Sequence, residues 1–149
     1  MRGFAAIALC DPYYDGNIGG AIRAASVYGA RLVVVGSKRP HRRGRIERTD
    51  PRKSHKHMPV VWSQDILQAL PHESQAVAVE IDPRAVSLPD FQHPESAYYI
   101  FGPENGSVPN DLIGICDHVV SIPTAGCMNL AATVNVVLYD RLAKQERSS

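Results

Sequence analysis

The chain has few cysteines, and their spacing argues against a disulfide framework or a zinc site. Its 149 residues include only Cys10, Cys116 and Cys127, an odd number with no CxxC pair. Because disulfides belong to oxidising compartments, this cysteine usage indicates a cytoplasmic protein. We expect all three thiols to be buried and inert, and we expect no metal, since no group of residues has ligand spacing.

Long apolar runs are also missing. No stretch approaches the roughly 18 residues that are needed to cross a bilayer. The first residues, MRGFAAIALCDPYYDG, are too briefly apolar for a signal peptide and contain no small-residue cleavage site. No GxGxxG fingerprint follows this run, which argues against an NAD enzyme. We interpret residues 3–10 as the first buried strand of one domain that spans residues 1–149.

What the chain does have is one concentrated basic segment. Residues 38–57, KRPHRRGRIERTDPRKSHKH, carry nine Lys or Arg and two acidic residues, whereas the rest carries seven and thirteen. This asymmetry predicts a loop, at about residues 37–57, that binds a polyanion. The candidate RNA-binding residues are Lys38, Arg39, Arg42, Arg43, Arg45, Arg48, Arg52 and Lys53. A solvated loop that only aids solubility is the alternative.

Strand-like and helix-like segments alternate along the sequence. Short apolar runs predict strands over residues 3–10, 31–35, 59–62, 76–81, 97–101 and 117–122. Helices are predicted over residues 18–28, 64–70, 109–115 and 127–145. This order predicts an α/β fold, a parallel sheet with helices on both faces. Ligands of such sheets bind beyond the carboxyl ends of the strands, which directs attention to the loops after Cys10, Phe101 and Ile122.

Three motifs follow strands in this way. The first, NIGGAIRAA, has Asn17 at a predicted N-cap and places Arg23 six residues later on the same helix. The second, FGPENGSVP, allows a tight turn through Gly102 and presents Glu104. The third, SIPTAGCMNLAATVNVVLYDR, leads from a strand into a helix that bears Asn129 and Asn135. Buried amides need partners, which a ligand or a second subunit could supply.

Together these motifs resemble the signature of the SpoU (TrmH-like) branch of the SPOUT RNA methyltransferases. The pattern N-x-G-x-x-x-R is matched by Asn17, Gly19 and Arg23. A Gly-x-Glu turn after a strand is matched by Gly102 and Glu104, and an Ile-Pro start by Ile122 and Pro123. The string MNL followed by VVLYD is similar to small single-domain members that methylate a tRNA ribose.

The resemblance implies a doubly wound SPOUT fold with a C-terminal trefoil knot, homodimerisation, and S-adenosylmethionine as methyl donor. In the family the donor is held by three loops that lie in the knot. The implied cofactor-binding residues are Val79, Glu80, Gly102, Ile122, Cys127, Met128 and Leu130. Of these, Ile122, Met128 and Leu130 would enclose an adenine. Relatives dimerise through their first and last helices, whose small residues here suit close packing.

The implied reaction is methylation of a ribose 2′-hydroxyl, most closely that of a tRNA. The catalytic candidates are Arg23, Asn17, Glu104 and Asn129. A guanidinium is practically never deprotonated, so we expect Arg23 to stabilise the developing oxyanion rather than to act as a base. We expect Glu104 to orient Arg23.

Three other interpretations remain open at this point. One is a SPOUT base methyltransferase, which would need a further acid or base near the third motif. Another is a catalytically silent RNA-binding module with the same fold. A nucleotide-binding α/β enzyme is the third, although its phosphate-loop fingerprints are missing.

Overall fold

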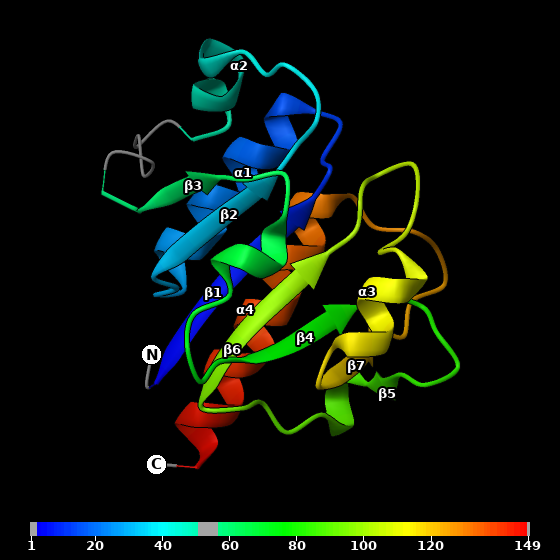
Figure 1. Ribbon diagram of the computed structural model, residues 1–149. Helices are drawn as coiled ribbons and strands as arrows, with labels where there is room; N and C mark the ends of the chain where they lie inside the picture. Colours follow the sequence, from blue (N-terminus) through cyan, green and yellow to red (C-terminus); the bar gives the residue numbers. More distant parts are fainter. Residues whose placement is uncertain (1–2, 51–56, 149) are drawn as a thin grey trace.

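A computed structural model of the protein describes residues 3–50 and 57–148. Its centre is one seven-stranded sheet in the order β3-β2-β1-β6-β4-β7-β5, and every pair of neighbouring strands is parallel (Figure 1). The strands are β1 (Phe4–Cys10), β2 (Leu32–Gly36), β3 (Val60–Trp62), β4 (Gln75–Val79), β5 (Val86–Ser87), β6 (Ser96–Phe101) and β7 (His118–Ser121). The predicted parallel α/β architecture is confirmed.

The central strands are apolar at consecutive positions because both faces of the sheet are covered. In β1, residues Ala5 to Leu9 are all fully buried. Ile7 belongs to the core on one face of the sheet, whereas Ala6 and Ala8 belong to the core on the other. This alternation follows from the two-residue period of a strand.

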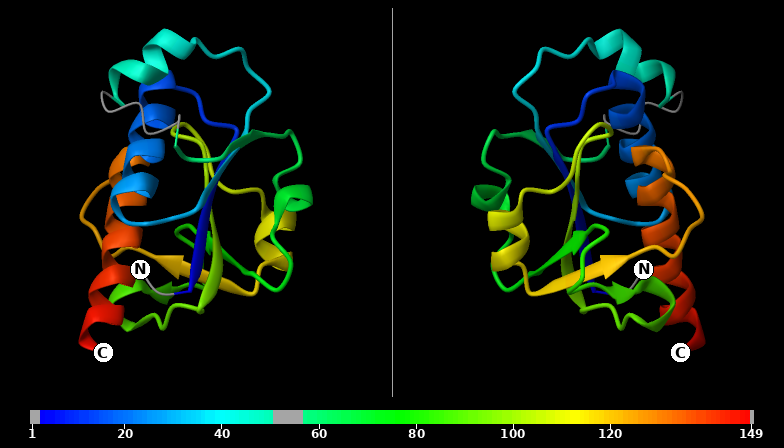
Figure 2. Two further views of the ribbon diagram at one scale, coloured as in Figure 1. Left: turned by 90° about the vertical axis from the view of Figure 1, so that its left-hand side faces the viewer. Right: turned by 90° about the vertical axis from the view of Figure 1, so that its right-hand side faces the viewer.

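Helices cover both faces, as predicted (Figure 2). One face carries α1 (Asp15–Val27), α4 (Leu130–Arg147) and, packed on α1, the short α2 (Arg43–Arg48). The other carries α3 (Asn110–Ile115) and the 3₁₀ turn η2 (Ile66–Ala69), and a second 3₁₀ turn, η3 (Leu88–Asp90), lies against α4. Among the described residues no helix is long and apolar enough to cross a membrane. The trefoil knot stays a prediction.

The small residues of α1 and α4 pack against each other within one chain. A Cβ atom added to Gly20 would lie 2.8 Å from the Cβ of Ala131, and Ala21, Ala24 and Ala25 are buried. This contact within the chain covers the small-residue faces in part, since Gly20, Ala131 and Ala132 remain half-buried. The homodimer through the first and last helices stays a prediction.

Several element boundaries differ from the sequence prediction. Helix α1 begins at Asp15, with Tyr14 at the N-cap, so Asn17 lies in the first turn and is not the cap. Helix α4 begins at Leu130, where the Asn129 side chain accepts a hydrogen bond from the Ala132 amide at 2.8 Å. The basic segment, predicted to be a loop, contains α2. Ile46 is its apolar anchor, and Gly19 of α1 lets the Ile46 backbone approach closely.

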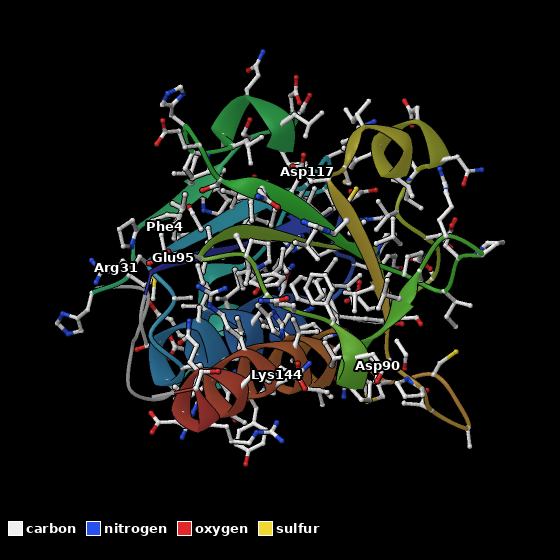
Figure 3. All side chains as sticks on the ribbon, turned by 90° about the horizontal axis from the view of Figure 1, so that it is seen from below. Phe4, Arg31, Asp90, Glu95, Asp117 and Lys144 are labelled. Atoms are coloured by element: carbon white, nitrogen blue, oxygen red, sulfur yellow. The ribbon has the colours of Figure 1, made fainter. Side chains whose placement is uncertain are left out.

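At the amino ends of the strands, a buried arginine joins the C-terminal helix to the sheet. The Arg141 side chain is fully buried and donates to the carbonyls of Pro94 (2.6 Å) and Glu95 (2.8 Å) and to the Tyr99 hydroxyl (3.0 Å). Burial raises the pKa of Tyr99 to about 12, so its hydroxyl stays neutral. Figure 3 looks onto this edge from below and labels Phe4 and Glu95.

Lys144, one turn further along α4, repeats the pattern. Its ammonium group donates to the carbonyls of Leu88 (2.6 Å) and Phe91 (2.7 Å) and pairs with Asp140 (Figure 3). Asp140 also bonds His93 at 2.7 Å. The amino edge of the sheet is thus closed by charges that have internal partners.

Candidate functional site

A pocket lies at the opposite edge, beyond the carboxyl ends of β4, β6 and β7. It is lined by Val79, Glu80, Ile81, Phe101, Gly102, Pro103, Glu104, Gly106, Ile122, Thr124, Gly126, Cys127, Met128, Leu130 and Thr133. All seven residues that the family resemblance implies for the methyl donor are among them. Two of the three loops singled out by the sequence, those after Phe101 and Ile122, form most of its wall.

The turn after β6 requires glycine at position 102. A Cβ atom there would lie 2.8 Å from the Val108 amide nitrogen and 3.0 Å from the Ser107 carbonyl carbon. The loop therefore folds back directly over Gly102. It is held there by Glu80, whose carboxylate accepts a hydrogen bond from the Val108 amide at 3.2 Å. This role of the Glu80 side chain had no signal in the sequence.

Glu104 connects this loop to the start of α1. Its carboxylate accepts hydrogen bonds from the amides of Tyr13 (2.8 Å) and Tyr14 (3.0 Å) and from Asn17 Nδ2 (2.8 Å). Desolvation alone would raise the pKa of Glu104, but these hydrogen bonds outweigh it and lower the pKa below its ordinary value. Since Asn17 is not the helix cap, its amide is available for this contact.

The structure does not bring Glu104 and Arg23 together. Arg23 is half-buried on α1, about 9 Å further along the helix axis than Asn17, and does not line the pocket. The expectation that Glu104 orients Arg23 is therefore wrong, because the carboxylate is engaged by Asn17 and two amides. Within residues 3–50 and 57–148, the Arg23 guanidinium has no hydrogen-bond or ion-pair partner.

The two asparagines of the third motif satisfy their amides locally. Asn129 caps α4 and lies between the pocket residues Met128 and Leu130. Asn135 donates to the Ala131 carbonyl at 2.8 Å, one turn back along the same helix. The partners that we expected from a ligand or a second subunit are thus supplied by α4 itself for Asn129 Oδ1 and Asn135 Nδ2.

The loop between β1 and α1 fastens the basic segment to this edge. Asp11, with a backbone φ of +47°, accepts hydrogen bonds from the Lys38 amide (3.2 Å) and the Arg39 guanidinium (3.4 Å). His41 bonds the Ser37 hydroxyl (2.6 Å) and the Asp15 carboxylate. Desolvation raises the pKa of Asp15, but its bonds to His41 and the Arg42 amide bring it below its ordinary value. The contacts of Asp11 and Asp15 with this segment cross 26–28 residues of sequence, so the sequence did not reveal them.

The candidate RNA-binding residues differ in how they are placed. Lys38, Arg42, Arg45 and Arg48 are exposed, and Arg39 is half-buried against Tyr13, with its guanidinium carbon 4.6 Å from the ring centre. Arg43 begins α2. Arg52 and Lys53 lie outside the described residues.

The cysteines differ from the prediction in one case. Cys127 is exposed and lines the pocket, so the expectation that all three thiols are buried is wrong there. Cys10 and Cys116 are partly buried, and desolvation raises the pKa of both thiols. Cys127 is therefore the accessible thiol of this edge.

Comparisons with known proteins agree with the resemblance. Residues 5–139 match the model of the family described as the SpoU rRNA Methylase family. No curated protein matches the chain significantly. Solved structures share the fold at 16–22% identity.

Three solved structures illustrate this similarity. The SpoU methyltransferase AviRb from Streptomyces viridochromogenes, in complex with AdoMet, has a TM-score of 0.84 and 22% identity over 98% of this chain and 59% of its own. An AdoMet-bound rRNA methyltransferase from Sinorhizobium meliloti has a TM-score of 0.83 and 20% identity over 97% and 57%. A third structure, which concerns the 2-OH methylation of C/U34 on tRNA, has a TM-score of 0.80 and 20% identity over 97% of both chains. The chain thus spans under two thirds of the first two proteins and nearly all of the third.

Proposed function

Because the chain belongs to the SpoU rRNA methylase family, we propose that it transfers the methyl group of S-adenosylmethionine to a ribose 2′-hydroxyl of RNA, specifically of a tRNA. The observation that carries the proposal is the pocket at the carboxyl edge. Seven residues from three separate loops, chosen from the resemblance alone, line this one pocket. The tRNA part rests on the neighbour of nearly equal length, which concerns 2-OH methylation of C/U34 on tRNA.

The pocket fits the chemistry of the proposed donor. Ile122, Met128 and Leu130 offer an apolar surface for an adenine, and the backbone at Gly102 offers polar groups beside it. When bound, S-adenosylmethionine supplies an electrophilic methyl group on a positively charged sulfur. Glu80 and Glu104 are both among the lining residues, and two acidic residues beside the pocket favour a cationic ligand.

We assign to Arg23 the stabilisation of negative charge at the ribose oxygen. Its guanidinium stays protonated, presents donors in a fixed fork and has no partner among the described residues that would compete with a substrate. Asn17 and Glu104 fix the start of the helix that carries Arg23. Asn129 fixes the start of α4 beside the pocket.

We also propose that the protein acts as a homodimer that uses the exposed face of α4. Val136 and Tyr139 are 37% and 59% exposed and line an apolar groove together with Pro123 and Ile122. Ile122 lines the candidate donor pocket as well. A second chain in this groove would therefore touch the wall of the active site.

Two measurements test the proposed reaction. Calorimetry should detect S-adenosylhomocysteine binding, and tritiated S-adenosylmethionine should label bulk tRNA from a strain that lacks the gene. After alkaline hydrolysis the label should remain in dinucleotides, because a 2′-O-methyl group blocks cleavage of the adjoining phosphodiester. Label in mononucleotides would instead identify a base methyltransferase. Cofactor and RNA binding without transfer would identify a silent RNA-binding module.

A further inference from the structure

We propose that Tyr14, with Tyr13 and Arg39 beside it, forms a stacking platform for an unpaired RNA base next to the target ribose. The inference rests on the proposed function and adds to it a substrate class, namely RNA that is single-stranded or looped where the enzyme acts. It starts from two aromatic side chains that the fold leaves in solvent at the edge of the candidate site. Tyr13 and Tyr14 are 45% and 58% exposed.

The backbone of Tyr14 is held on both sides. Its amide donates to the Glu104 carboxylate at 3.0 Å, and its carbonyl accepts the first hydrogen bonds of α1, from the amides of Asn17 and Ile18. Glu104 is also one of the residues that line the donor pocket. The position of the ring is therefore tied to the pocket, and little backbone ordering is left for a ligand to impose.

The neighbouring ring has its own partners, which leaves Tyr14 as the free one. The two rings meet edge to face at 4.7 Å, and the Arg39 guanidinium lies over the Tyr13 ring at 4.6 Å. Arg39 is itself held by Asp11. The Tyr13 ring is thus in contact with both Arg39 and Tyr14. Tyr14 is the more exposed of the two, and among the described residues its ring contacts no other ring than that of Tyr13.

Charge around the pair indicates what covers it. The exposed cations Lys38 and Arg42 lie on the segment that Asp11 and Asp15 bind to the same loop. Rings flanked by cations suit nucleic acid, because bases stack on aromatic faces while phosphates pair with Lys and Arg. In duplex RNA the base faces are stacked on each other and closed to side chains, so this platform serves an unpaired base.

The test compares binding of two RNA probes by fluorescence anisotropy. One is a labelled single-stranded oligouridylate of about ten nucleotides, within the range that such surfaces bind. The other is a blunt RNA duplex of the same length. Tyr14→Ala should weaken binding of the single strand roughly five- to a hundredfold, the effect of losing one aromatic platform. Its binding of the duplex should not change.

Matched variants separate stacking from charge. Tyr14→Phe should bind the single strand like the parent, because the ring remains, whereas Tyr14→Leu should lose affinity like Tyr14→Ala. The salt dependence of binding should stay unchanged in Tyr14→Ala and flatten by about 0.7 log units in Arg39→Ala, if Arg39 neutralises one phosphate. Ile115→Ala, which removes an exposed apolar side chain from α3, should bind as the parent does.

Three outcomes would overturn the inference. The first is that Tyr14→Ala binds the single strand as tightly as the parent does, and the second is that its affinity for the duplex falls as much as its affinity for the single strand. The third is that free Tyr14→Ala has a different sedimentation coefficient from the parent, which would show that a second copy covers the ring. Calorimetry with S-adenosylhomocysteine on the same samples keeps the proposed function apart. A parent that binds no cofactor refutes that function, whatever the probes show.

Discussion

The two edges of the sheet differ in whether their polar and charged side chains have partners within the chain. At the amino edge Arg141 is fully buried, and it and Lys144 donate to four backbone carbonyls at 2.6–2.8 Å. At the carboxyl edge Tyr14 and Cys127 are exposed, and Arg23, on the helix that starts at this edge, has no partner in the described part of the chain. Cations with internal partners thus hold the amino edge together, whereas side chains near the carboxyl edge are left without partners and are available to a ligand.

The largest effect that this contrast predicts concerns Arg141. Arg141→Leu should lower the free energy of unfolding by about 3 kcal/mol or more, because it leaves several buried acceptors unpaired at about 1–3 kcal/mol each. Urea unfolding followed by circular dichroism measures the change. The control is Arg31→Leu, an exposed arginine near the same edge, which should stay within about 0.5 kcal/mol of the parent. A parent-like Arg141→Leu would show that the amino edge does not depend on this residue.

Arg23 should show the reverse pattern, a loss of rate with stability retained. Arg23→Ala and Arg23→Lys should both lower single-turnover methylation roughly a hundredfold or more, as the loss of an oxyanion donor does. Lysine fails because a point charge on a flexible stem does not hold two oxygens at once. Both variants should unfold at the parent's urea concentration and bind S-adenosylhomocysteine normally. Turnover of Arg23→Ala within a few-fold of the parent, measured on bulk tRNA, would refute the assignment.

The smallest predicted effect is the contribution of Glu104 to acid stability. Its folded-state pKa is lowered, so the unfolded chain takes up the proton first as the pH falls. The stabilisation is therefore complete above the ordinary value of 4.5 and is lost as the pH falls through the lower, folded value. Glu104→Gln should flatten the decline of unfolding free energy below pH 4.5, measured by urea titrations at several pH values. An equally steep decline in both proteins would argue against the charged clamp on Tyr13, Tyr14 and Asn17.

The sequence predicted the sheet well because its strands are buried on both faces. Runs such as FAAIALC and LVVVG have few alternatives to a central parallel strand, and all six predicted strands are present within one or two residues of their bounds. The two-residue β5 was missed, since VS has no recognisable pattern. Helix α2 was missed because Ile46 is the only large apolar residue among its six positions, so the segment shows no apolar periodicity.

For the site, the sequence placed residues around the pocket better than it paired their side chains. The motifs put Gly102 directly after β6 and Ile122 directly after β7, and a parallel sheet gathers the carboxyl ends of its strands at one edge. Partners are a different matter, because they depend on contacts across the chain. Asn17 and Glu104 are 87 residues apart, and nothing in either motif indicates that Asn17 gives up the cap to bond Glu104.

The most direct test of the account is whether the methyl donor shields Cys127. This thiol is exposed on the pocket wall, whereas the raised pKa values of Cys10 and Cys116 keep those thiols protonated and slow to react. Alkylation with iodoacetamide, mapped by mass spectrometry, should label Cys127 first. S-adenosylhomocysteine, at a concentration that calorimetry shows to be saturating, should slow the labelling of Cys127 several-fold and leave the rate at Cys10 unchanged. Equal labelling of Cys127 with and without saturating ligand would contradict the placement of the donor in this pocket.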